Sequence, residues 1–209
     1  MTDNRTIWDG AYQRRRQIYG GVAPEIPKMP PGARVLELGC GNGKNTSPLL
    51  VQGYEVVALD FSYVAAGAAR AGLPATGKGH AVLADARHLP FRPGSFDAVT
   101  ARHIIGHMTR AGREAIASEI IEVLTVGGTL HFAAFSREDF RAGQGTCVEA
   151  DSFLRGDGIS THYFSDNEVL DLFKPLACVS LAGRTWDLRV RGRTYGRAEI
   201  HAIFCRPEP

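Results

Sequence analysis

The chain has 209 residues and a formal net charge of +2 at pH 7, with 44% hydrophobic and 22% charged residues. These values are typical of a soluble globular protein, and we expect residues 1–209 to form a single domain. The weak net charge gives no strong field toward nucleic acid or a membrane surface. The polar start, Met1 to Arg5, is followed by no apolar stretch, so we expect neither a signal peptide nor a membrane span.

The cysteines occur singly, without the C-x-x-C spacing of a zinc or redox motif. Three of them lie among apolar or glycine neighbours. We therefore expect buried, reduced thiols rather than disulfides or metal ligands, and a cytoplasmic location. The cysteines are Cys40, Cys147, Cys178 and Cys205.

Residues 1–30 are expected to form an N-terminal arm that combines aromatic and basic residues in a helix-like pattern. Prolines at 24, 27, 30 and 31 then break any helix. Strands are expected at 34–38, 54–59, 81–84, 96–100 and 129–135, and helices from about residue 46, over 63–71 and over 113–124. Gly127 and Gly128 are expected to end the last of these helices. Strands that alternate with helices indicate an α/β fold with a parallel sheet covered on both faces.

After Ser136 the alternating pattern stops for almost thirty residues. We expect residues 136–164 to be an irregular insertion that covers a substrate, since long loops in compact domains are usually functional or disordered. Ser165 to Glu168 matches a capping box and predicts a helix over 168–173. Two closing strands, near 178–190 and 198–205, are expected to pair antiparallel.

The stretch VLELGCGNG, residues 35–43, is the most informative of the chain. A short apolar run carries Glu37 into Gly39, Gly41 and Gly43, which predicts a strand that turns tightly beneath a bound molecule. The third glycine comes one residue earlier than in the dinucleotide fingerprint G-x-G-x-x-G. A carboxylate at residue 37 would also repel a pyrophosphate, so a cationic or amino-bearing ligand suits this loop better.

Two further carboxylates follow the next two expected strands. Asp60 ends the second strand, where an acidic side chain can accept both hydrogen bonds of a ribose diol. Asp85 ends the third. An alternative is that these strand-end carboxylates only cap helices.

In residues and spacing, the loop resembles motif I (acidic-x-G-x-G-x-G) of class I S-adenosylmethionine-dependent methyltransferases. Trp8-Asp-x-x-Tyr12 ahead of it is similar to small standalone members of the type-11 and tellurite-resistance-like group. The resemblance implies a Rossmann-like three-layer sandwich, with a mostly parallel seven-stranded sheet and an antiparallel C-terminal strand. It also implies that Asp85 accepts a hydrogen bond from the adenine amino group. The methionine part of the cofactor would then lie next to Arg102 and His103, which follow the fourth strand.

The cofactor implied is S-adenosylmethionine. Tyr12 and Arg16 fit either an arm folded over the pocket or a solvated helix face. Cys40 is expected as a small filler in the loop rather than a nucleophile. The expected cofactor-binding residues are Tyr12, Arg16, Glu37, Gly39, Cys40, Gly41, Gly43, Asp60, Phe61, Asp85, Ala86, Arg102 and His103.

Four polar residues are expected to reach the acceptor: His103, His107, His162 and Tyr163. His103 and His107 have the i, i+4 spacing of a helical metal pair, but no glutamate of H-E-x-x-H accompanies them, so we expect no metal. Imidazole titrates near neutral pH, and one of these histidines as a general base is the better hypothesis.

The sequence does not identify the acceptor. The fourth strand lacks the Asn/Asp-Pro-Pro-Tyr motif of amino-directed enzymes, so a small-molecule acceptor is the leading hypothesis. The alternatives are an RNA or protein methyltransferase that uses the arginine-rich C-terminal segment, and a module that binds the cofactor without turnover. Those arginines also fit the solvated face of an edge strand. The sequence leaves the oligomeric state open.

Overall fold

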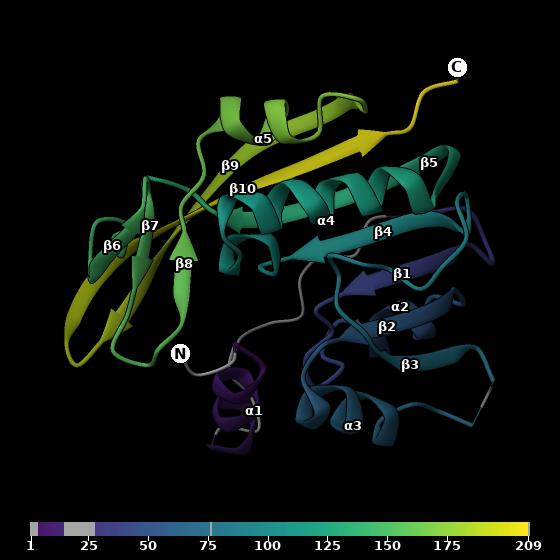
Figure 1. The fold of residues 1–209 in the computed structure, drawn as a ribbon, viewed down its shortest axis with the longest axis horizontal. Coiled ribbons are helices and arrows are strands. Elements are labelled where there is room, and N and C mark those ends of the chain that lie inside the picture. Colours follow the sequence, from purple (N-terminus) through teal and green to yellow (C-terminus); the bar gives the residue numbers. More distant parts are fainter. Residues whose placement is uncertain (1–3, 15–27, 76, 209) are drawn as a thin grey trace.

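The computed structural model describes residues 4–14, 28–75 and 77–208 (Figure 1). A central sheet of seven strands has the order β3-β2-β1-β4-β5-β10-β9. Its strands are β1 Arg34–Leu38, β2 Glu55–Asp60, β3 Gly79–Leu83, β4 Phe96–Arg102, β5 Leu124–Phe135, β9 Ala177–Val190 and β10 Arg193–Cys205. The helices are α1 Asn4–Arg14, α2 Thr46–Val51, α3 Tyr63–Ala71, α4 Arg110–Val123 and α5 Asp166–Leu172, with the short 3-10 helix η1 Ile105–His107.

Strand β1 shows why the fold has three layers. Successive side chains of a strand point to opposite faces. Val35 therefore packs with Leu49 of α2 on one face. Leu36, on the other face, belongs to the larger core that contains Ile116 of α4. Because β1 has buried apolar side chains on both faces, it is a central strand between two helical layers, as the sequence predicted.

The sheet is parallel from β3 to β5, and β10 is antiparallel to both of its neighbours, β5 and β9. The predicted mostly parallel seven-stranded sheet with an antiparallel C-terminal strand is confirmed. The hairpin turn between β9 and β10 consists of Arg191 and Gly192, whose φ angles are 47° and 79°. Positive φ at both central residues is the geometry that matches strand twist in two-residue hairpins.

Two predicted boundaries were wrong at helix α4 and strand β5. Thr109 caps α4 by accepting from the backbone N–H of Gly112, so the helix starts at Arg110 instead of 113. The chain is already extended at Leu124, with ψ 138°, so β5 begins there and Gly127 lies inside the strand. A side-chain cap and the docking of Leu124 in the core ended the helix before the glycines.

Residues 136–164 are not irregular as expected, because they contain a second, three-stranded antiparallel sheet. It consists of β6 Thr146–Glu149, β7 Ser152–Leu154 and β8 Ser160–His162. Figure 1 shows it at one end of the central sheet, beside the β9–β10 hairpin. Two backbone hydrogen bonds fix the ends of the segment 136–164 to the central sheet. Ser136 donates to Ala198 of β10, and Phe164 donates to Phe135 of β5.

The expectation of buried cysteines holds only for Cys40. Cys147 and Cys178 are exposed, and all four thiols are free. Apolar neighbours in sequence do not bury a thiol on an edge strand such as β9. No helix in the described part of the chain is long and apolar enough to span a membrane.

Candidate cofactor and acceptor site

A cavity of about 1430 Å³ opens at the carboxyl ends of β1, β2 and β4. This is the edge where open α/β sheets bind ligands. Its lining comes from α1, from the glycine loop, from the ends of the parallel strands and from the segments 141–163 and 184–199. The cavity therefore joins the sequence-predicted loop to residues more than a hundred positions away.

The glycine loop requires its glycines. Gly39, Gly41 and Gly43 have φ angles of 66°, 55° and 83°, which side chains rarely adopt. A Cβ on Gly39 would lie 3.0 Å from Ile104, and one on Gly41 would lie 3.0 Å from the hydroxyl of Tyr12. The loop thus presents bare backbone to the cavity. Gly43 faces α3 instead of the cavity.

Cys40 lies in this loop with a buried side chain. Burial, reinforced by the nearby acids Glu37 and Asp60, raises the pKa of its thiol far above the ordinary value. A thiol that stays protonated is a poor nucleophile. The geometry agrees with the interpretation of Cys40 as a filler residue.

Glu37 lies beneath the loop, only 2% exposed, and does not itself line the cavity. Its Oε2 accepts a 2.5 Å hydrogen bond from Thr46. Its Oε1 is buried without a hydrogen-bond partner among the described residues. Burial raises the pKa of Glu37 to about 7. A buried carboxylate with an unused oxygen favours a positive charge nearby.

Asp60 is 5% exposed and borders the cavity. Its Oδ2 accepts from the backbone N–H of Gly41 at 3.0 Å, and its Oδ1 accepts from that of Ser62 at 2.9 Å. Burial raises its pKa in spite of these bonds. Each carboxylate oxygen can accept more than one hydrogen bond, so a diol can bind beside the two amides.

Asp85 lies on the cavity wall with Phe61 and Ala86. Arg87 donates to both of its carboxylate oxygens, at 2.6 to 3.1 Å. These bonds lower the pKa of Asp85. An amino group that binds at Asp85 must therefore share this carboxylate with Arg87, which the sequence did not indicate.

These features fit S-adenosylmethionine, which combines an ammonium group, a ribose diol and an adenine amino group. Residues 35–128 match the family model described as a methyltransferase domain. These residues form a methyltransferase domain of the class I S-adenosylmethionine-dependent type. Its cofactor is S-adenosylmethionine.

Relatives of this methyltransferase domain differ in what they modify. The demethylmenaquinone methyltransferase of Beutenbergia cavernae is 39% identical over 111 residues, which are 51% of this chain and 42% of that protein. The tRNA N(3)-cytidine methyltransferase METTL2 of Gallus gallus is 25% identical over 175 residues, which are 78% of this chain and 46% of that protein. The chain thus spans about half the length of the curated relatives it matches.

Solved structures share the fold. An S-adenosylmethionine-dependent methyltransferase of Methanosarcina mazei superposes with a TM-score of 0.70 at 23% identity, covering 86% of this chain and 95% of that one. The 1,6-didemethyltoxoflavin-N1-methyltransferase of Burkholderia thailandensis, solved with bound 1,6-didemethyltoxoflavin and S-adenosylhomocysteine, gives a TM-score of 0.64 at 17% identity, covering 85% of this chain and 72% of that one.

Helix α1 of the methyltransferase domain lies against the cavity. Tyr12 and Trp8 line it, and the Trp8 ring meets His107 edge-on with centroids 4.9 Å apart. Asp9 of the same helix accepts a hydrogen bond from Ser62, next to Asp60. Arg16, the other predicted residue of the arm, lies outside the described residues.

His103 follows β4 with a φ of 55°, a strained conformation for a residue with a side chain. Its Nε2 donates to Oε1 of Glu199 at 3.1 Å. Burial would raise the pKa of Glu199, but hydrogen bonds from His103 and His201 outweigh it and hold that pKa well below its ordinary value. Glu199 is therefore ionised and orients the His103 ring within the cavity, next to Arg102.

His107 also lines the cavity, but burial lowers its pKa to about 4. Its Nδ1 donates to the carbonyl of Ser160 at 2.9 Å. The ring is neutral at pH 7. His103 and His107 are not paired on one helix, because His103 precedes η1 in a left-handed conformation. The described residues contain no group of three or more His, Cys, Asp or Glu able to hold a metal.

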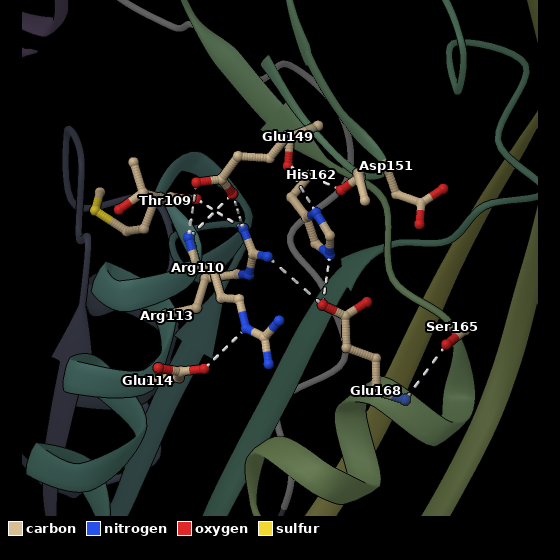
Figure 2. Close-up of polar contacts among 12 residues, drawn as sticks. Thr109, Arg110, Arg113, Glu114, Glu149, Asp151, His162, Ser165 and Glu168 are labelled. Carbon is tan, nitrogen blue, oxygen red and sulfur yellow. Dashed lines mark hydrogen bonds and ion pairs between the residues drawn. The ribbon is translucent and has the colours of Figure 1, made fainter. Parts of the chain in front are cut away.

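His162 does not reach the cavity. It is 2% exposed, with Ser152 Oγ 2.8 Å from its Nδ1 and Glu168 accepting from its Nε2 at 2.7 Å. Figure 2 shows His162 facing Glu168, whose carboxylate also meets Arg113 of α4. The next residue, Tyr163, lines the cavity. His162 thus joins the small sheet to α4 and α5, and its expected contact with the acceptor is wrong.

Several cavity residues were not among the expected site residues. They lie far along the chain and reach the cavity from β9, from β10, from the loop after β5 and from the loop between β7 and β8. A carboxylate next to a histidine in the folded state cannot be found from sequence spacing when 96 positions separate them. These residues are Arg141, Arg155, Arg184, Arg197 and Glu199.

Proposed function

We propose that the chain transfers a methyl group from S-adenosylmethionine to a small-molecule acceptor. The observation that carries this proposal is the extent of the cavity. It continues from the glycine loop past His103 to Tyr163, Trp186 and Arg197. A pocket built only for the cofactor would need no such extension, whereas an acceptor must lie next to the transferred methyl group.

The bound cofactor supplies an activated methyl group on a sulfonium. The protein then has to position the acceptor and exclude water. Residues 136–164, with the strands β6 to β8, serve in this proposal as the acceptor cover, and α1 closes the cofactor side. Tyr163 contributes to the wall from within the cover, 1% exposed.

His103 is the proposed general base, needed where the acceptor must lose a proton. Its imidazole takes up that proton while ionised Glu199 stabilises the resulting cation, as a carboxylate does for a histidine in other acid–base pairs. His107 is a weaker candidate because a pKa of about 4 makes it a weak base, and its Nδ1 is already bonded to the carbonyl of Ser160. The proposal locates the reaction in the cytoplasm, since four free thiols suit a reducing compartment.

The resemblance to tRNA methyltransferases supports a second candidate, an RNA acceptor. Incubation of the protein with S-adenosylmethionine and either a metabolite library or tRNA, with release of S-adenosylhomocysteine as the readout, separates the two. A third outcome, cofactor binding without turnover on either, would indicate a binding module. His103→Gln should lower turnover at least tenfold while cofactor affinity is kept, and equal turnover would reject His103 as the base.

A further inference from the structure

The outer end of the cavity is lined by three arginines, Arg141, Arg155 and Arg197, which we call the outer arginine cluster. All three act electrostatically on Tyr163, together with one carboxylate, Asp139. Three cations against one anion leave an excess of positive charge around a buried phenol. Such an excess in a partly dehydrated site calls for an anion.

Arg197 is the most constrained member of the cluster. Arg197 is 8% exposed, and its Nε donates to Asp139 at 2.6 Å. Its guanidinium stacks over Phe135 at 4.4 Å and Trp186 at 5.4 Å. Its Nη2, however, is buried without a hydrogen-bond partner among the described residues. Buried donors are nearly always satisfied, so an unused N–H of a cavity-lining arginine indicates a missing acceptor atom.

Asp139 cannot neutralise the other two arginines. It already accepts from Arg197, from the backbone N–H of Ala198 at 3.2 Å and from that of Arg141 at 3.0 Å. Burial and, to a smaller extent, the positive charges of Arg197 and Arg155 lower the pKa of Arg141. The outer arginine cluster therefore holds three cations beside a single ion-paired carboxylate, Asp139.

The cluster lies on the acceptor side of the cavity. The cofactor residues Asp85, Asp60 and Gly39 belong to the ends of β3, β2 and β1, and Arg102 to β4. Arg197 lies on β10, two strands beyond β4 in the sheet order. Neighbouring strands are about 4.8 Å apart, so two steps place it roughly 10 Å from the end of β4. The carboxylate of the cofactor's methionine is thus not the natural partner of Arg197.

We propose that the methyl acceptor is a small organic anion, whose carboxylate or phosphate is bound by Arg197, Arg141 and Arg155. This inference rests on the proposed methyl transfer. Guanidinium groups suit both anions, because their planar forks bind two oxygens at once. Phe135 and Trp186 border the cluster and give the apolar part of such a molecule a surface to pack on.

The test uses the full chain saturated with S-adenosylhomocysteine. Binding is measured by thermal shift and calorimetry for a panel of aryl carboxylates, each matched with its phosphate ester analogue and its neutral amide. We expect binding compounds among the acids, and at least tenfold weaker binding of the matched amides. The carboxylate and phosphate arms identify the anion.

The variant Arg141→Gln/Arg155→Gln should weaken the acids at least tenfold and leave the affinity for S-adenosylhomocysteine unchanged. Arg141→Lys/Arg155→Lys should retain part of the binding, and Arg189→Gln, an exposed arginine of β9 that does not line the cavity, should retain all of it. Amides that bind as well as acids, or a panel without any binding acid, would overturn the proposal. The proposal would also be overturned if Arg141→Gln/Arg155→Gln lost affinity for S-adenosylhomocysteine. It would be overturned as well if the wild-type protein bound RNA and this double variant did not. Failure of the wild-type protein to bind S-adenosylhomocysteine would instead overturn the proposed methyl transfer, and the acceptor with it.

Discussion

Replacement of Asp60 by alanine is the most direct test of the cofactor site. The Asp60 carboxylate accepts two bonds from backbone amides and keeps further acceptor positions, and the residue lines the cavity. If these receive the ribose diol, the variant loses two charge-assisted hydrogen bonds. Each is worth about 1.5–3 kcal/mol at a buried site, and since such losses are not additive we expect about 2–4 kcal/mol. That corresponds to roughly 30- to 1000-fold weaker binding of S-adenosylmethionine.

The variant also frees the backbone amide of Gly41, which could weaken the loop without any contact to the ribose. Deoxy analogues of S-adenosylhomocysteine separate the two effects in a double-mutant cycle. Wild-type protein should bind the 2′- and 3′-deoxy analogues less tightly than the parent, whereas Asp60→Ala should bind all three about equally. Calorimetry that gives unchanged affinity for Asp60→Ala, or the same loss on removing each hydroxyl in both proteins, would refute the assigned contact.

Further predictions concern stability, partners and the acceptor cover. Folding raises the pKa of Glu37 from 4.5 to about 7, so the folded state binds this proton more tightly than the unfolded state. Without cofactor, the free energy of unfolding should therefore fall by roughly 3 kcal/mol as the pH rises from below 4.5 to above 7. Urea unfolding at pH 5 and 8 should show that Glu37→Gln removes this dependence. Gel-shift assays at physiological salt should show no RNA or DNA binding; a band lost in Arg189→Gln/Arg191→Gln would contradict the small-molecule acceptor. His162→Ala should lower the free energy of unfolding by about 2–4 kcal/mol through its bond to a carboxylate, whereas Tyr163→Phe should lower turnover and spare cofactor affinity. Equal unfolding midpoints, or unaffected turnover, would reject these two roles.

The cofactor half of the site could be predicted because its signals are local. Gly39 and Gly41 adopt positive φ angles, a local backbone requirement that favours glycine. Asp60 directly follows a run of apolar residues that can only be a buried strand, and parallel strands bring their carboxyl ends to one edge. Each of these inferences needs only the order of residues and the topology of a parallel sheet.

The acceptor half could not be predicted, because its geometry depends on distant pairing. His162 ends β8 and Tyr163 follows it, and which of the two faces the cavity depends on the register of β8 against β7. The expected capping box shows the same limit. Ser165 caps α5 as predicted, yet the carboxylate of Glu168 binds His162 and Arg113, residues the motif does not involve.

The two halves of the cavity also differ in what similarity can reveal about them. The family match ends at residue 128, while the outer arginine cluster and Tyr163 all lie beyond residue 140. The relatives name two different acceptors, a quinone for a match of 111 residues and a tRNA cytidine for a match of 175 residues at 25% identity. Because the cofactor half imposes no requirement on the acceptor, neither name transfers by that similarity alone. The charge of the outer cluster is a property of this chain, and it favours an anion over a neutral quinone ring.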